Sequence, residues 1–280
     1  MLGRSLPLDH GPLPVNAERT LAGEPGAVIS VEGLALLYGA GTDAVEALRD
    51  ISFSVADAEF VSVVGPSGCG KSTLLKILAG LLPATTGKGF LNGTPILGPR
   101  KDIGVVFQSP VLFPWRTVLA NVMLPADVQR LDKMAMTKRA LDLLRLVGLK
   151  GFETRYPWQL SGGMQQRVGI VRALLHDPAI LLMDEPFGAL DAMTREAMNV
   201  ELQRLWMERR KTVLFITHST AEACFLADRV LVMTARPGRI RDNVWIDLPR
   251  PRSLDVMNTE AFGAYVRRIR AGLNSDGGLD

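Results

Sequence analysis

Two groups of polar residues, far apart in the chain, have the types and spacing to bind a phosphate together with a metal ion. The first is an eight-residue segment that starts at Gly65 and ends with Gly70-Lys71-Ser72. Its glycines let the backbone wrap around a phosphate with its N–H groups, and a helix that begins there adds partial positive charge. Lys71 would reach the β- and γ-phosphates of a nucleotide, and the Ser72 hydroxyl would ligate Mg²⁺. The alternative, a glycine-rich turn that binds nothing, leaves the apolar run before it and the helical segment from Ser72 to Leu81 without a role.

The second group consists of two adjacent carboxylates, Asp184 and Glu185, at the end of an apolar run. Side chains alternate along an extended chain, so the two acids are expected to point in different directions and to do different jobs. Asp184 would hold Mg²⁺ through its water shell, and Glu185 would polarise an attacking water. A pair of solvated acids at a strand end is the alternative, and the complete phosphate loop upstream favours the metal and catalytic roles.

Short apolar runs separated by helical patterns predict an α/β fold. Continuous runs of this kind fit buried strands of a mainly parallel sheet. These runs are Phe60–Val64, Ile103–Phe107, Ile180–Met183, Val213–Thr217 and Val230–Met233. Upstream, Ile51 to Val55 alternates with period two, which predicts a small antiparallel β portion from about Val28 to Val55.

The same pattern divides the chain into regions. Residues 1–26 are rich in proline and glycine and are expected to form a mobile tail. Residues 27–247 would form one ATPase domain, in which residues 109–160 read as a helical insert without a buried strand. Residues 248–280 would form a C-terminal extension with a basic helical stretch around Tyr265 to Arg270.

A third motif, Leu160-Ser-Gly-Gly-Met-Gln-Gln-Arg167, resembles the signature motif of the ABC ATPase family. Further residues occur in the order that this family shows: Tyr38, Gln108 after a strand, Ala189-Leu190-Asp191, and His218 after another strand. The resemblance covers about residues 28 to 240. It implies a P-loop NTPase core whose cofactors are ATP and Mg²⁺.

The resemblance also assigns roles to individual residues. Glu185, His218 and Gln108 would be catalytic, and Ser72, Gln108 and Asp184 would hold the metal. Tyr38 would stack on adenine, although burial in the core is its alternative; a structural role is the alternative for His218. Cys69 is expected to fill space rather than to act as a redox switch, although a helix N-terminus would lower its pKa. The residues expected to contact the nucleotide are Tyr38, Gly65, Pro66, Ser67, Gly68, Cys69, Gly70, Lys71, Ser72, Thr73, Ser161, Gly162, Gly163 and Asp191.

Partners follow from the resemblance as well. Ser161 caps a predicted helix whose N-terminus is an anion site, and in the family that site serves the ATP of a second subunit, which implies a head-to-tail homodimer. Three segments look like those of importers for nitrate, sulfonate, taurine or bicarbonate: Gln108–Val122, Ala235–Ile240 and Leu248–Arg252. Such a subunit would dock on integral membrane permease subunits, and indirectly serve a periplasmic or lipoprotein solute-binding protein. Phe113, Trp115 and Arg116 would form part of the docking groove, unless they are buried inside the helical insert.

Composition sets outer limits on these interpretations. The chain has 280 residues and a formal charge of +3, which gives no argument for nucleic acid as a partner. No apolar run is long enough to span a bilayer. The resemblance implies a peripheral location on the cytoplasmic face of the inner membrane. The alternative class is a soluble ABC ATPase of DNA repair or chromosome organisation. Such proteins carry long coiled coils or zinc modules, and neither pattern is visible here.

Overall fold

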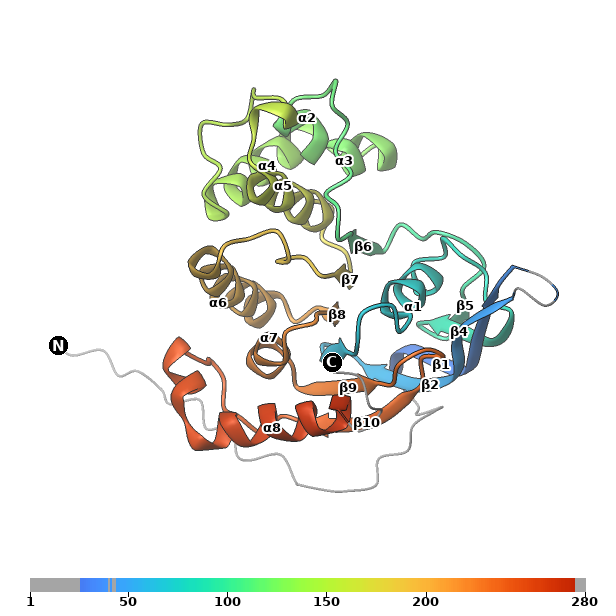
Figure 1. The fold of residues 1–280 in the computed structure, drawn as a ribbon. Coiled ribbons are helices and arrows are strands. Elements are labelled where there is room, and N and C mark those ends of the chain that lie inside the picture. The colour runs from blue at the N-terminus through green and yellow to red at the C-terminus, as the bar shows by residue number, and fades with distance from the viewer. Residues whose placement is uncertain (1–25, 40, 42–43, 275–280) are drawn as a thin grey trace.

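The computed structural model describes residues 26–39, 41 and 44–274 of the chain. The expected tail of residues 1–26 therefore lies almost entirely outside the described residues. Figure 1 shows a central sheet, a second sheet beside it and a group of helices at the far end from helix α8. Within the part that is described, no helix is long and apolar enough to cross a membrane.

The central sheet has six strands in the order β10-β9-β3-β8-β7-β6. Five of them run parallel, and β10 pairs antiparallel with β9 at one edge. The bounds are β3 (Phe60–Val64), β6 (Ile103–Val106), β7 (Ile180–Asp184), β8 (Thr212–Ile216), β9 (Arg229–Met233) and β10 (Ile240–Trp245). The predicted parallel strands are thus confirmed to within one residue at each end.

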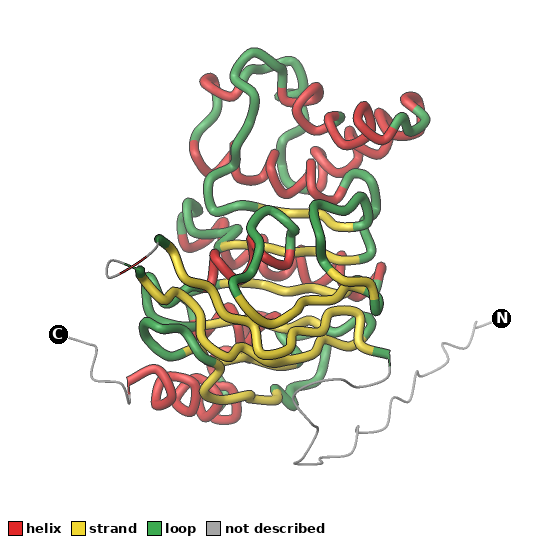
Figure 2. The backbone as a smooth tube through the Cα atoms, turned by 90° about the vertical axis from the view of Figure 1, so that its right-hand side faces the viewer, coloured by secondary structure: helices red, strands yellow, loops and turns green. Residues whose placement is uncertain are grey.

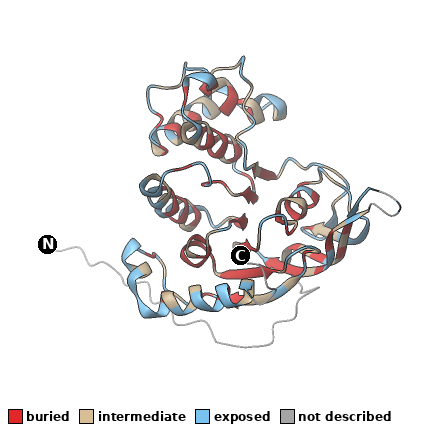
Figure 3. Ribbon diagram, in the orientation of Figure 1, coloured by how far each residue is buried: buried red, intermediate tan, exposed pale blue. Residues whose placement is uncertain are grey.

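Both faces of this sheet are covered, which explains why its strands are continuously apolar. Leu182 and Leu214 face a core formed with helix α1 (Lys71–Leu78) and the second sheet. Leu181 and Phe215 face the opposite core. That core is built with helices α5 (Gly162–Leu174), α6 (Ala192–Arg209), α7 (Thr220–Leu226) and α8 (Glu260–Asn274). Figure 3 shows the strands as buried and the outer helix faces as exposed.

The second sheet is antiparallel and has the order β2-β1-β4-β5. Figure 2 shows the strands in yellow below the helical group at the top. The predicted antiparallel portion was incomplete, because it stopped before the two strands that follow helix α1. Helix α1 is also shorter than predicted: it ends at Leu78, and Gly80 turns the chain with a φ of +72°. A Cβ at Gly80 would lie 2.2 Å from Gly98, so only glycine fits this turn. The bounds are β1 (Ala27–Tyr38), β2 (Val45–Ala56), β4 (Thr86–Leu91) and β5 (Thr94–Pro95).

Residues 109–160 contain helices and no strand, as the sequence pattern predicts. They form the group at the top of Figure 1, which packs on α5. Asp132 caps the longest of these helices, and Ala140 and Leu144 form its buried side. The bounds are α2 (Val118–Val122), α3 (Leu124–Gln129), α4 (Lys133–Leu146) and the 3₁₀ turn η2 (Pro157–Gln159).

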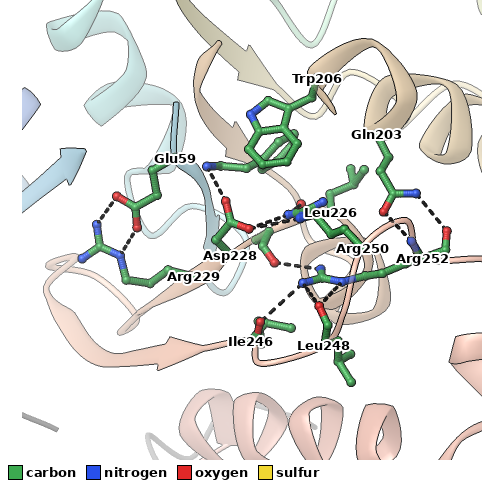
Figure 4. A network of polar contacts seen from close by, with 12 residues as sticks. Glu59, Gln203, Trp206, Leu226, Asp228, Arg229, Ile246, Leu248, Arg250 and Arg252 are labelled. Atoms are coloured by element: carbon green, nitrogen blue, oxygen red, sulfur yellow. Dashed lines mark hydrogen bonds and ion pairs between the residues drawn. The ribbon is translucent and has the colours of Figure 1, made fainter. Parts of the chain in front are cut away.

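The start of the predicted C-terminal extension is tied to the core by buried arginines. Arg252 is only 3% exposed and donates hydrogen bonds to three carbonyl oxygens at the end of α7. Figure 4 shows Arg252 with its contacts to Ile246 and Leu248. Gln203 of α6 pairs with the backbone of Arg252 in both directions, at 2.8 and 2.9 Å. Arg250 pairs with Asp228 and lies over the ring of Trp206. Beyond this segment, η3 (Leu254–Asn258) leads into α8.

Candidate nucleotide-binding site

The segment from Gly65 to Ser72 forms a loop between β3 and the N-terminus of α1. Gly68 and Gly70 have φ angles of +73° and +99°, a backbone conformation that favours glycine. A Cβ at Gly70 would lie 2.6 Å from Leu48, and one at Gly65 would lie 2.7 Å from the sulfur of Cys69. The loop therefore depends on its glycines for both conformation and space, and it places backbone N–H groups at the start of a helix.

Lys71 lies within the curve of this loop. Its side chain is buried, and its ammonium donates to the carbonyl oxygens of Gly65 at 2.7 Å and Pro66 at 2.9 Å. These contacts hold a positive charge at the centre of the loop. An anion seated over the loop would meet that charge together with the N–H groups of the helix start.

A cavity of about 460 Å³ opens over the loop and gathers residues that are far apart in the sequence. Its lining comes from the ends of β1, β3, β6, β7, β8 and β9 and from the start of β2. The lining residues are Tyr38, Val45, Ala47, Ser67, Gly68, Gly70, Lys71, Ser72, Thr73, Gln108, Glu185, His218 and Arg236. A second cavity of about 390 Å³ lies between α4, α6 and the sheet, and none of the predicted site residues lines it.

Tyr38 closes one end of the larger cavity. It ends β1, its side chain is half-exposed, and its hydroxyl lies 3.2 Å from the Thr73 hydroxyl. Val45 at the start of β2 lines the cavity nearby. The ring is therefore held beside the loop rather than buried in the core, which removes the core alternative and leaves a face for a flat ligand.

Asp184 supplies a buried carboxylate beside Ser72, a residue that lines the cavity. Burial raises its pKa, and a hydrogen bond with Ser72 partly opposes that rise. Its Oδ1 atom is buried and has no hydrogen-bond partner in the protein. An orphaned carboxylate oxygen beside a serine hydroxyl is a hard oxygen donor set, which fits Mg²⁺. These residues would hold the ion, whose chemistry would be to neutralise charge on the phosphates.

Glu185 lies between two polar side chains from the neighbouring strands. Its Oε2 accepts a hydrogen bond from Gln108 Nε2 at 3.2 Å and lies 3.3 Å from His218 Nδ1. Strand β7 ends at Asp184, and Glu185 takes a positive φ of +46° while its N–H bonds to Ile216. A positive φ in a residue other than glycine is strained, and such strained residues cluster at functional sites. Glu185, the strained residue here, lies just past the end of strand β7, which positions Asp184.

The residues of the signature motif, and Asp191, do not line this cavity. Ser161 caps α5 by accepting from the Met164 N–H at 3.3 Å, and a Cβ at Gly162 would meet nothing within 4 Å. Gly163 packs near Leu190. Asp191 caps α6, and the hydrogen bond from the Thr194 N–H lowers its pKa. None of Ser161, Gly162, Gly163 and Asp191 lines the cavity.

Two findings differ from the expectations. Burial raises the pKa of the Cys69 thiol, so the expected lowering by the helix N-terminus is wrong: desolvation outweighs the nearby charge of Lys71. Arg236 lines the cavity and donates to Gly68 O at 3.3 Å, yet it was not among the predicted site residues. The Ala235–Ile240 segment was noted only as a subgroup pattern, and nothing in it shows that the chain returns to the loop.

A glycine loop at a helix start, a buried lysine within it and two adjacent carboxylates at the end of one strand define a P-loop nucleotide-binding protein. Residues 48–188, which are half of the chain, match the ABC transporter family. This chain belongs to the ABC transporter family as an ATP-binding, ATP-hydrolysing subunit.

Several relatives extend this match. An ABC transporter ATP-binding protein of Methanocaldococcus jannaschii, MJ0412, is 52% identical over 80% of this chain and 84% of its own. The aliphatic sulfonates import protein SsuB of Bacillus licheniformis is 48% identical over 77% of this chain and 84% of its own. The taurine import protein TauB of Burkholderia thailandensis is 44% identical over 88% of this chain and 91% of its own.

Solved structures agree on the fold. A dimeric structure of the ATP-binding cassette MJ0796 bound to ADP and Pi has a TM-score of 0.71 and 33% sequence identity. It covers 78% of this chain and 98% of its own. The DNA-repair alternative finds no support among these relatives.

Proposed function

We propose that this chain binds Mg²⁺ and ATP in the cavity over the phosphate loop and hydrolyses ATP to drive import of a small solute. The observation that carries the proposal is the meeting of Lys71, Glu185, Gln108 and His218 at one cavity. Asp184 lies beside it through its hydrogen bond with Ser72, which lines the cavity. Residues 27–247 are proposed as the ATPase domain, with residues 109–160 as its helical insert and 248–280 as its extension.

Each residue has a role that its place suggests. Tyr38 would support the adenine, and the loop from Gly65 to Thr73 would hold the phosphates with Lys71 as counter-charge. Glu185 would orient a water and accept its proton as the water oxygen bonds to the γ-phosphorus. His218 and Gln108, which already contact Glu185, would align that carboxylate and the γ-phosphate. The leaving group is ADP.

The position of the signature favours a second chain as the other half of the site. Ser161, Gly162 and Gly163 form an open helix start that does not line the cavity of their own chain. Such a start binds an anion, so a head-to-tail homodimer would place it over the partner's ATP. The dimeric ATP-binding cassette among the related structures supports this arrangement.

The partners and the solute follow from the relatives. SsuB and TauB carry names of sulfonate and taurine import, and we propose a sulfonate, taurine, nitrate or similar small solute here. The subunit would sit on the cytoplasmic face of the membrane, docked on permease subunits that receive solute from a binding protein. Trp115 is 70% exposed, and its ring lies tilted beside that of Phe113 with 5.1 Å between the ring centres. This exposure supports a docking role over burial for Trp115.

The proposal is tested with Lys71→Ala and the wild-type chain, each reconstituted with its permease subunits in vesicles. Lys71→Ala removes the counter-charge at the centre of the loop and should abolish tight ATP binding, hydrolysis and uptake of radiolabelled taurine, alkanesulfonate or nitrate. ATP binding is followed by titration of a fluorescent ATP analogue. ATP affinity like that of wild type in Lys71→Ala would contradict the assignment of the loop. ATP-driven uptake of none of the three solutes would contradict the solute class.

A further inference from the structure

Glu222 is a buried carboxylate to which the proposed hydrolysis mechanism gives no role. It lies in the first turn of α7, is 7% exposed, and its Oε2 accepts from the Thr217 hydroxyl at 2.6 Å. The Thr217 oxygen accepts in turn from the N–H of Ser219 at 2.9 Å. These two bonds hold the backbone on both sides of His218. The carboxylate therefore fixes the turn that carries the histidine.

The other oxygen of Glu222 faces helix α6. Arg195 Nε lies 3.5 Å from Glu222 Oε1, and Arg195 Nη2 donates to the carbonyl oxygen of Leu190 at 3.0 Å. Leu190 directly precedes Asp191, which caps α6. One carboxylate thus connects the turn of His218 with the turn that leads into α6, two segments that are separate in sequence.

The buried environment of Glu222 disfavours the charged form of its carboxyl group. Burial raises its pKa, and its contacts with Thr217 and Arg195 oppose that rise. A buried carboxylate is destabilising unless it is hydrogen-bonded and paired, and an apolar residue would fill the same space at a lower cost. A role in positioning neighbouring residues would account for the buried carboxylate of Glu222.

We propose that Glu222 is a positioning residue for ATP hydrolysis, which holds His218 at a fixed place relative to Glu185 and to the start of α6 through Thr217 and Arg195. The inference rests on the proposed role of His218. Since His218 Nδ1 lies 3.3 Å from Glu185 Oε2, a shift of the turn would move the histidine away from the carboxylate that orients water. A misplacement of about 1 Å near reacting groups can cost about a hundredfold in rate.

The test compares Glu222→Gln in the wild-type chain and in a His218→Ala chain. Glutamine keeps the size and an oxygen for Thr217, but it loses the charge that faces Arg195. In the wild-type chain, kcat should fall by about tenfold or more, while the KM for ATP should change by less than about threefold. In the His218→Ala chain, Glu222→Gln should cost less than about twofold, because its effect passes through the missing imidazole. Single-turnover assays at high protein concentration make the slow rates measurable.

Glu59→Gln is the matched control. Glu59 is also a buried glutamate paired with an arginine, at 2.7 Å from Arg229, but it precedes β3 at the end of the sheet opposite the site. Its substitution should lower the melting temperature, as Glu222→Gln should, and leave kcat unchanged. Loss of stability alone would then not explain a fall in kcat.

Thr217→Val gives a second, independent variant if Glu222→Gln does not fold. Valine keeps the shape of threonine and removes the hydroxyl that joins Glu222 to the turn, so its cost should also vanish in the His218→Ala chain. A wild-type kcat in either variant, or an equal loss with and without His218, would overturn the inference. Hydrolysis at the wild-type rate in His218→Ala itself would overturn the proposed role of His218, and the inference with it.

Discussion

Glu185 and Asp184 are neighbours in sequence but have different surroundings, and this difference separates binding from chemistry. Asp184 is buried with an orphaned oxygen beside Ser72, whereas Glu185 is partly exposed and contacts Gln108 and His218. The first environment suits a metal ion, and the second suits a water that is oriented for attack.

Glu185→Gln should therefore bind ATP but fail to hydrolyse it. The substitution keeps the size and the hydrogen bonds of the side chain but removes the base, so turnover should fall by about 10²–10⁴-fold while ATP affinity is retained. Asp184→Asn should instead lose Mg²⁺-dependent ATP binding. Phosphate release and nucleotide titration, each with and without Mg²⁺, measure the two effects. A near-normal rate in Glu185→Gln would transfer the catalytic role to another residue, with His218 as the next candidate.

The residues of the site were predictable because their motifs combine special backbone needs with scarce chemistry. A loop with three glycines that ends in Lys71-Ser72 has few functions other than phosphate binding. Arg236 was missed for the opposite reason, since an arginine after a strand is common. Backbone hydrogen bonds of Gly238 with β2 and its close packing against Cys69 bring the segment to the loop, and local sequence does not show these contacts. Glu222 gives no signal in the sequence, because its partners come from two other segments.

At the scale of elements, the parallel strands were predictable and the strands β4 and β5 were not. The parallel strands are buried on both faces, so an unbroken apolar run marks each of them. Strand β4 reads Thr-Gly-Lys-Gly-Phe-Leu and is mostly exposed, and two glycines lower its intrinsic strand preference. It forms because β1 offers a partner edge, and a pairing between distant segments is not written in local sequence.

The burial of the segment from Leu248 to Arg252 could not be predicted from local sequence either. Two prolines and two arginines look like an exposed linker, yet Arg250 and Arg252 are inserted between α6, α7 and the strand end at Ile246 (Figure 4). Burial lowers the pKa of Arg252 to about 10, which still leaves it charged at neutral pH. Its donors satisfy carbonyl groups at the end of α7 that have no helical partner.

Arg252→Met should destabilise the chain, because it leaves several buried carbonyl groups without a donor. A loss of about 3 kcal/mol in the free energy of unfolding is expected, at the scale of a broken buried charged network. Urea unfolding followed by circular dichroism measures it. Arg270→Met on the exposed side of α8 serves as the control and should change stability by less than about 0.5 kcal/mol. Equal stability of Arg252→Met and wild type would show that residues 248–252 are not part of the folded core.

At the scale of the whole molecule, the two halves of the proposed ATP site lie on different surfaces of one chain. The cavity over the phosphate loop includes no residue of the signature. The signature is itself ready for an anion, with Ser161 as the cap of α5 and free space around Gly162. The proposed head-to-tail homodimer would complete this arrangement.

Two inactive variants should therefore restore activity to each other. Lys71→Ala spoils the phosphate loop and leaves the signature intact. Gly162→Asp leaves the loop intact and places a negative charge where the partner's phosphates would lie, while the open space at Gly162 allows the fold to persist. Each variant alone should be nearly inactive. In a mixture, each heterodimer contains one site with an intact loop and an intact signature, so random pairing would restore about a quarter of the sites.

The test measures ATP hydrolysis by the mixture and by each variant alone, at equal total concentration. A rate for the mixture above the sum of the separate variants would support a site shared between two chains. Gly162→Ala is the control, because its small uncharged side chain also fits the open space and should allow hydrolysis on its own. Light scattering with Mg-ATP should show weak dimers for wild type and more persistent dimers for Glu185→Gln, since unhydrolysed ATP keeps both chains in contact. A mixture no more active than its parts, with dimers that do not respond to ATP, would mean that each chain completes its site alone. The open helix start at Ser161 would then need another ligand.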